Sequence, residues 1–152
     1  MIDRRSGAVV QAPVTWISTV PSVANLTRAR PEAYLIPRTW GGAVVERLRI
    51  LGVEVETLDR GYRGAVDTLT VATSSLARSM YEGGHVLNTV TTTPGRREVV
   101  LPPGSFRVPT RQKNAALAFV ALEPESIDSY VTFGIVPLKA GEEYPVFRIP
   151  RS

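Results

Sequence analysis

Valine and leucine residues recur with a helical period in one stretch near the start of the chain. They fall on one side of a helix predicted over residues 39–51. Thr39 is suited to cap the start of this helix, and Gly52 can end it in a left-handed conformation. The apolar runs on either side, 33–36 and 53–58, have the character of strands. Together they predict a strand–helix–strand unit.

A second helix is predicted over residues 112–122. Its core, residues 115–122, is apolar on every side, Thr110 can cap its start and Pro124 ends it. A helix without a polar side must be covered all round. We therefore expect Leu117 to be buried, and Leu117→Asp to destabilise the domain severely.

From Gly64 onward, apolar and polar residues alternate with the period of a β-strand. Turn signals at Gly83-Gly84, Pro94-Gly95 and Pro102-Pro103-Gly104 separate the runs. Strands are predicted at residues 68–74, 85–93, 97–101, 105–108, 129–136 and 144–149. Pro145 interrupts the last run, which favours an edge strand. We expect a mainly β (α+β) fold, an antiparallel β-sandwich-like domain with two short helices.

The first thirty residues differ in character from the rest. Strand-like runs at 8–10 and 14–17 predict a short hairpin, and the stretch up to Pro31 is polar and flanked by prolines. We therefore divide the chain into a lead-in hairpin and linker, residues 1–30, and a compact β-rich domain, residues 31–152.

Composition and charge exclude several classes of protein. The 152 residues suit one domain, and 43% hydrophobic residues are too many for a disordered chain. The 18 basic and 14 acidic side chains are spread evenly, without the basic patch that nucleic-acid binding requires. No stretch reaches the roughly 20 apolar residues that span a bilayer. We expect a soluble protein that binds neither nucleic acid nor membrane.

The residues available for catalysis are few. The chain has no cysteine and a single histidine, His85, whereas a catalytic zinc needs about three His or carboxylate ligands. His85 is also the only base for a serine triad, and no Gly-x-Ser-x-Gly, Gly-x-Gly-x-x-Gly or P-loop sequence occurs. We predict no catalytic residue, metal site or cofactor within this chain.

The densest polar cluster is Glu123-Pro124-Glu125-Ser126-Ile127-Asp128-Ser129. The main interpretation is a turn in which Ser126 and Asp128 accept backbone N–H bonds. Glu125 and Asp128 are the alternative candidates for an interface or ligand contact. Asn25 begins the sequon Asn-Leu-Thr, a possible glycosylation site if the chain is secreted.

Several segments resemble the region that follows the catalytic domain in carboxypeptidase A-like zinc metallocarboxypeptidases, particularly secreted fungal ones. The most specific is Leu-Glu-Pro-Glu-Ser-x-Asp-Ser at residues 122–129. The others are residues 30–40, 45–58, 81–83, 87–90, 103–106, 110–114, 128–130 and 143–148. The resemblance covers about residues 7–150.

The resemblance implies an accessory β-rich C-terminal domain without its enzyme. The family places its zinc ligands, a His-x-x-Glu pair and a later His, and its general-base Glu in the preceding catalytic domain. None can be carried over, because His85 is followed by Val86, Leu87 and Asn88. The implied partner is the parent's catalytic domain, the zinc belongs to that domain, and the implied location is extracellular; a chain without that parent would be cytoplasmic.

Three hypotheses about the role of the chain follow, of which the third, a carbohydrate- or wall-binding module, rests only on the two Trp and five Tyr residues. The first is a non-catalytic domain whose partner-facing surface, exposed in isolation, causes self-association. Tyr130, Phe133, Tyr144 and Phe147 are the candidates for that surface, with core positions as the alternative. The second hypothesis is a stand-alone domain that binds or transforms a small molecule in an apolar cavity between sheet and helix, with Tyr and Arg side chains as polar contacts.

Overall fold

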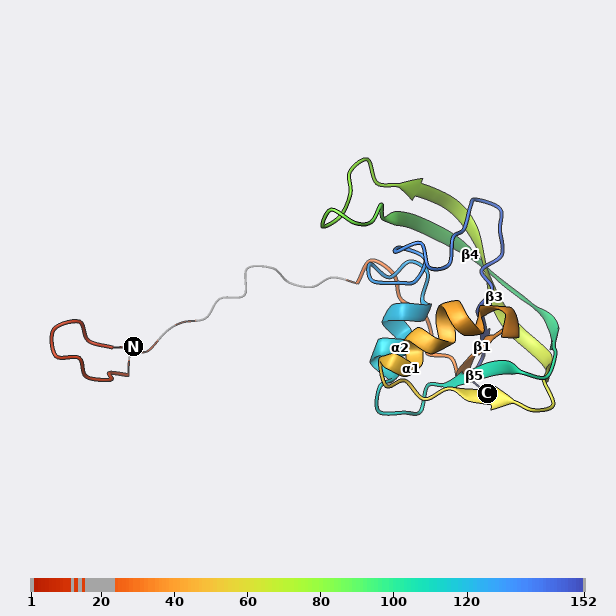
Figure 1. Cartoon of the computed structure of the whole chain (residues 1–152), viewed down its shortest axis with the longest axis horizontal. Helices are drawn as coiled ribbons and strands as arrows, with labels where there is room; N and C mark the ends of the chain where they lie inside the picture. Colours follow the sequence, from red (N-terminus) through yellow and green to blue (C-terminus); the bar gives the residue numbers. More distant parts are fainter. Residues whose placement is uncertain (1, 12, 14, 16–23, 152) are drawn as a thin grey trace.

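Six β-strands form one antiparallel sheet, in the order β2-β5-β1-β6-β3-β4, among the described residues 2–11, 13, 15 and 24–151 of a computed structural model (Figure 1). The strands are β1 (Ala33–Ile36), β2 (Glu56–Leu58), β3 (Tyr62–Leu76), β4 (Asn88–Leu101), β5 (Ser105–Pro109) and β6 (Phe147–Ile149). Two short α-helices accompany them, which confirms the expected mainly β antiparallel fold.

The first predicted helix is present as a composite segment. A 3₁₀ turn (Arg38–Trp40) and a π-helical turn (Gly41–Val45) lead into α1 (Glu46–Ile50). Gly52, at φ +72°, ends the segment as predicted. Thr39 does not cap it, because the helical backbone already begins at Arg38, directly after Pro37.

The second helix, α2 (Ala115–Leu122), begins later than predicted. Asn114 occupies the cap position, while the Thr110 hydroxyl donates to the Pro31 carbonyl oxygen at 2.7 Å. The expectation of all-round burial is wrong, since Leu117 and Val120 are each 42% exposed. Only one side of α2 packs on the sheet, so apolar composition alone did not predict its burial.

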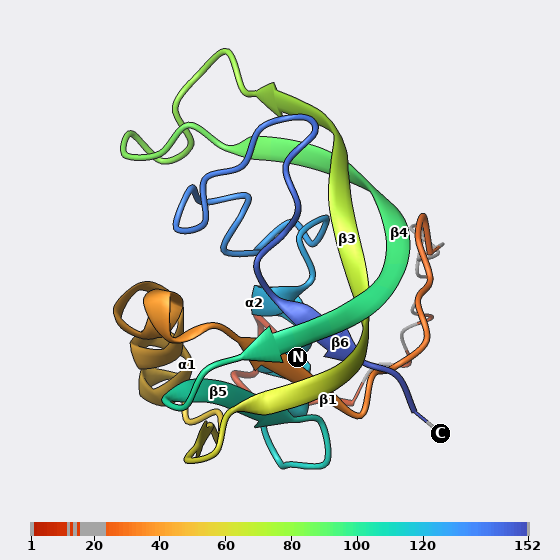
Figure 2. The same cartoon turned by 90° about the vertical axis from the view of Figure 1, so that its right-hand side faces the viewer.

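The longest elements, β3 and β4, pair along their whole length and curve strongly (Figure 2). Pro94-Gly95 does not form the predicted turn, because β4 runs through both residues, with Pro94 opposite Leu69. Proline is tolerated there because β4 is the outer strand of the sheet. The turns predicted around Gly83-Gly84 and Pro102–Gly104 are present.

The C-terminal part of the chain departs most from expectation. Residues 129–136 form turns instead of a strand, held by bonds such as Tyr130 N–H to the Ala121 carbonyl oxygen (3.0 Å). The last strand, β6, lies inside the sheet between β1 and β3, so the predicted edge position is wrong. Pro145 lies between Tyr144, whose N–H donates to the Leu69 carbonyl oxygen at 2.8 Å, and the paired residues of β6, so it removes no hydrogen bond from either.

The core occupies both faces of the sheet. In β1, Tyr34 and Ile36 point to the face covered by α1 and α2, and Leu35 points to the opposite face. The larger cluster lies on the helical side, and the smaller one contains Leu35, Val66, Val99, Leu101 and Phe147. Near the C-terminal end of α2, Tyr34 of β1 and Arg148 of β6 both contact Glu123.

At the start of the chain, Val9 pairs with Ile2 across a tight turn. The strand predicted at residues 14–17 lies outside the described residues except for Thr15. The proposed boundary at residue 31 stays a prediction. No helix within the described residues is long and apolar enough to cross a membrane.

Candidate functional site

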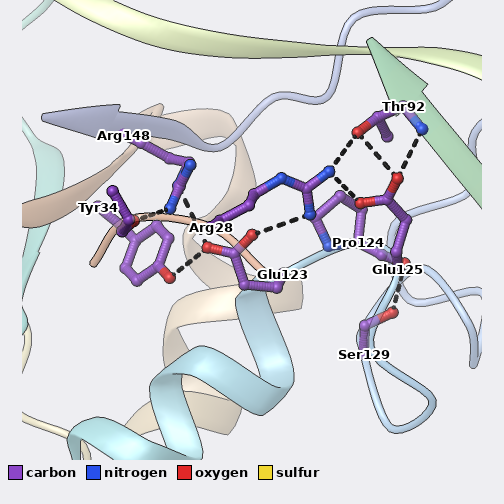
Figure 3. A network of polar contacts seen from close by, with 9 residues as sticks. Arg28, Tyr34, Thr92, Glu123, Pro124, Glu125, Ser129 and Arg148 are labelled. Atoms are coloured by element: carbon purple, nitrogen blue, oxygen red, sulfur yellow. Dashed lines mark hydrogen bonds and ion pairs between the residues drawn. The ribbon is translucent and has the colours of Figure 1, made fainter. Parts of the chain in front are cut away.

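The main concentration of polar contacts lies where the C-terminal end of α2 meets β1, β4 and β6. We call it the arginine–glutamate cluster; its members are Arg28, Tyr34, Thr92, Glu123, Glu125 and Arg148 (Figure 3). Pro124 interrupts the helix at this point, which places Glu123 at the end of α2 and Glu125 just beyond it.

Glu123 is held by three side chains from distant parts of the sequence. The Tyr34 hydroxyl donates to Glu123 Oε1 at 2.6 Å, and Arg148 Nε lies 3.2 Å from the same oxygen. Arg28 Nη1 lies 3.6 Å from Glu123 Oε2. Burial, followed by the charge and hydrogen bond of Glu123, raises the pKa of Tyr34 far above its usual value.

Glu125 is held by Arg28 and by the outer strand. The guanidinium of Arg28 forms an ion pair with it, and the Thr92 backbone N–H donates to its Oε1 at 2.7 Å. Arg28 Nη2 also donates to Thr92 Oγ1 at 2.9 Å. Arg28 thus lies between the two glutamates and joins them (Figure 3).

The same contacts attach residues 28–30 to the domain. Arg148 Nη2 donates to the Ala29 carbonyl oxygen at 2.6 Å. Arg30 donates through Nε to Thr110 Oγ1 at 3.2 Å and lies over the Phe119 ring, 5.4 Å from its centre. The segment before β1 is therefore bound to α2 and β6.

A cavity of about 310 Å³ opens beside the cluster. Phe119, Leu26 and Pro31 supply apolar surface, while three arginines and two glutamates supply charge. Both carboxylates face guanidinium groups, so neither is free to act as a general base toward a substrate. The geometry suits binding and attachment better than proton transfer.

The polar candidates predicted from sequence lie in different settings. Glu125 belongs to the cluster, whereas Asp128 is exposed. The turn between them is held by Ser129, whose Oγ donates to the Pro124 carbonyl oxygen at 3.0 Å and accepts from the Thr132 N–H at 3.0 Å. Asn25 is exposed, as the sequon hypothesis requires.

The four aromatic candidates do not form one exposed surface. Tyr144 is 1% exposed, and Tyr130 and Phe147 are also buried. Phe133 is half-buried and meets the rings of Tyr81 and His85 edge to face. Tyr144 and Phe147 are therefore core residues, and neither presents a free surface to a partner.

Exposed apolar side chains gather elsewhere, on neighbouring α1 and α2. Ile50 is 84% exposed and Leu51 44%, and they accompany Leu117 and Val120 of α2. We call these four residues the two-helix face. Asn114 Nδ2 donates to the Gly52 carbonyl oxygen at 2.7 Å, which joins the end of the first helix to the start of the second.

The sequence pattern does not identify Arg28, Tyr34, Glu123 or Arg148 as site residues. Glu123 belongs to the polar stretch 123–129, in which the candidate from sequence is its neighbour Glu125. Nothing in the local sequence marks Arg28 or Arg148, because their contacts with Glu123 join residues that lie far apart in the sequence.

The described residues do not fit a zinc site. No three His, Asp or Glu side chains among them come together in a group able to hold a metal ion. The glutamates of the cluster are bound to arginines, whose positive charge opposes a cation.

Comparison with known proteins gives a consistent result. The chain is 45% identical over 149 residues to carboxypeptidase 2 of Trichophyton rubrum and 44% identical to that of Trichophyton tonsurans, in each case covering 98% of this chain. A probable carboxypeptidase 2 of Arthroderma benhamiae is 42% identical over 128 residues. No family model and no solved structure matches.

The matches cover nearly all of this chain but only a small part of each related protein. The chain spans only 27% of the length of the two Trichophyton proteins. The resemblance to fungal carboxypeptidases expected from the sequence is confirmed, and the chain is similar over almost its whole length to one portion of the proteins named carboxypeptidase 2.

Proposed function

We propose that this chain is a non-catalytic accessory domain of a fungal-type zinc carboxypeptidase, packed against the domain that carries the active site. The observation that carries the proposal is the match of nearly the whole chain to about a quarter of carboxypeptidase 2. A β-rich fold whose central carboxylates are paired with arginines supports it, because such groups stabilise a domain and do not activate water.

The proposal assigns the remaining components to the rest of the parent protein. Zinc and its ligands belong to the catalytic portion, which accounts for the poor fit of the described residues to a metal ion. The location is extracellular, as the resemblance to secreted fungal enzymes implies. An exposed Asn25 is consistent with glycosylation there.

A chimera tests this proposal. The matching segment of Trichophyton rubrum carboxypeptidase 2 is replaced by this chain, and the product is compared with a protein that lacks the segment. We expect the chimera to fold and to release C-terminal residues from peptides, and the shortened protein to lose yield or stability. Equimolar zinc and chelator-sensitive peptidase activity in this chain alone would overturn the proposal.

A second candidate function is small-molecule binding in the cavity beside Phe119. It is favoured by the combination of an aromatic wall with Tyr34 and three arginines as polar contacts, at the lower end of the usual volume for ligand pockets. Thermal shift measurements with small carboxylates such as benzoate test it. Binding requires a stabilisation that Arg30→Gln removes, and no stabilisation by any carboxylate would exclude it.

A further inference from the structure

We propose that the two-helix face is the surface of this domain that docks against the catalytic portion of the parent carboxypeptidase. The inference rests on the proposed function and adds to it the site of contact. Its basis is four exposed apolar side chains on and next to α1 and α2, an apolar hollow beside α1, and exposed cations on α1 and just before α2 that form no ion pair with a described residue.

The first argument is the exposure of large aliphatic side chains on a folded surface. Ile50 is 84% exposed on α1, and Leu117 and Val120 are each 42% exposed on α2. Single exposed apolar residues are ordinary, but here they occur on two helical segments that are joined by the bond from Asn114 Nδ2 to the Gly52 carbonyl oxygen, and several exposed apolar residues in one region are typical of a protein interface. A free energy gain is available from covering them.

The second argument is the shape of this surface. Ile50 and Leu51 border a hollow of about 240 Å³, together with Arg47 and Tyr130. Tyr130 lies beside α2, since its N–H donates to the Ala121 carbonyl oxygen at 3.0 Å. The hollow therefore connects α1 to the region of α2, and it can receive an apolar side chain of a partner.

Exposed positive charges lie on α1 and just before α2. Arg47 and Arg49 of α1 are exposed, as are Arg111 and Lys113 just before α2. None of these four cations forms an ion pair with a described residue, whereas the cations of the arginine–glutamate cluster do. A partner surface with an apolar centre and Asp or Glu at its rim would complement this face.

The length of the related proteins points to the partner that would cover this face. Nearly three-quarters of the length of carboxypeptidase 2 lies outside the portion that this chain matches. In such a parent, a neighbouring domain is present at high effective concentration, and contacts between domains typically bury several hundred Å² or more. The catalytic portion of the same polypeptide is thus the partner to which the proposal commits.

The tip of the β3–β4 ribbon is the main competing surface. Leu76, Met80, Tyr81 and Val86 are exposed there. The two-helix face combines exposure, shape and charge. The ribbon tip also has exposed charges, Arg78 and Glu82, so it is the surface with which the experiment compares the two-helix face.

Hydrogen exchange on the chimera with Trichophyton rubrum carboxypeptidase 2 provides the direct test. Amides of residues 46–51 and 115–122 are compared between this chain alone and the chimera. We expect exchange about tenfold slower in the chimera in both segments, and unchanged exchange at residues 72–86. Slower exchange confined to residues 72–86, or no change in the helices of an active chimera, would overturn the docking inference.

A matched pair of variants adds a second readout. Ile50→Asp changes the two-helix face, and Ile127→Asp changes an isoleucine of similar exposure, 77%, that is not a member of it and does not border the hollow. Both should leave the thermal unfolding of the isolated chain unchanged. Only Ile50→Asp should lower the temperature of thermal inactivation of the chimera, by several degrees. Equal effects of the two variants on the chimera would contradict the proposal.

The outcomes separate this inference from the proposed function. A chimera that neither folds nor hydrolyses peptides would refute the accessory role itself. An active chimera with unprotected helices would refute only the docking surface. Sedimentation provides the remaining comparison. A dimer that Ile50→Asp dissolves in the isolated chain and that is absent from the active chimera agrees with the proposal, whereas a dimer through this face that persists in the active chimera would assign the face to a second copy and overturn it.

Discussion

The C-terminal end of α2 and its outer side differ in how far the domain itself supplies their contacts. At its C-terminal end, Glu123 meets Tyr34, Arg28 and Arg148. On its outer side, Leu117 and Val120 meet no covering element and stay half-exposed. The difference teaches that the charges at the end of α2 are paired inside the domain, whereas the apolar side chains on its outer side are left partly in solvent, on the face that we propose for docking.

The largest expected effect concerns the arginine–glutamate cluster. Glu123→Ala leaves Arg28 and Arg148 without one of their carboxylates and Tyr34 without its acceptor. We expect a loss of about 3–5 kcal/mol in the free energy of unfolding, as for other broken buried ion pairs. Urea unfolding measures it, with Asp128→Ala as the exposed control. A loss below about 1 kcal/mol would mean that the cluster is solvated.

The next effect compares two leucines of the same helix. Leu122 is 1% exposed and Leu117 is 42% exposed. Leu122→Ala should lower the free energy of unfolding by about 2–5 kcal/mol, and Leu117→Ala by less than about 1 kcal/mol in the isolated chain. Thermal and urea unfolding measure both values. Equal losses would show that the outer side of α2 is covered after all.

High pH should weaken the region around the cluster. Burial raises the pKa values of Tyr34 and Tyr144 far above their ordinary values, with the Glu123 charge adding to the shift. The unfolded chain therefore loses these protons first as the pH rises through about 10, and stability falls by up to about 1.4 kcal/mol per pH unit for each tyrosine. Urea unfolding between pH 8 and 11 measures this slope.

Phenylalanine variants identify the groups responsible for the alkaline slope. Tyr144→Phe should make the slope shallower at little cost at neutral pH, because its buried hydroxyl has no hydrogen-bond partner among the described residues. Tyr34→Phe should also make it shallower but lose the bond to Glu123. An alkaline slope that neither substitution alters would contradict the assignment.

The smallest effect belongs to an exposed ion pair. Arg97 Nη2 lies 2.6 Å from Glu143 Oε1, with about half of the arginine side chain in solvent. We expect Glu143→Ala to change the free energy of unfolding by less than about 1 kcal/mol, and salt to reduce even that difference. Unfolding at low and high ionic strength measures it. An effect as large as that of Glu123→Ala would remove the distinction between paired groups in the cluster and at the surface.

Local signals explain which elements were predictable. The apolar stripe and Gly52 define the first helical segment, since both act within a few residues. Pro94 was read as a turn because its place on an outer strand depends on the strand order. Leu117 was read as buried because apolar character does not say which side of a helix meets the sheet.

The candidate site was less predictable than the fold. Glu125 stood out in a dense polar stretch, but its partner Arg28 lies at the other end of the sequence and resembles any other surface arginine. Tyr34 was visible only as part of a strand. Their assembly depends on β6 entering the sheet beside β1, a pairing that connects residues more than a hundred positions apart.

The outer strand β4 has a consequence for aggregation. Incoming β-strands add to a sheet by bonding to the unpaired N–H groups of its edge. Along that edge, Pro94 has no N–H, the N–H of Thr92 is taken by Glu125, and the N–H of Asn88 by the Thr132 carbonyl oxygen. The first half of the strand is thus closed to templated growth, so misassembly into fibrils through residues 88–94 should require prior opening of the 124–132 segment.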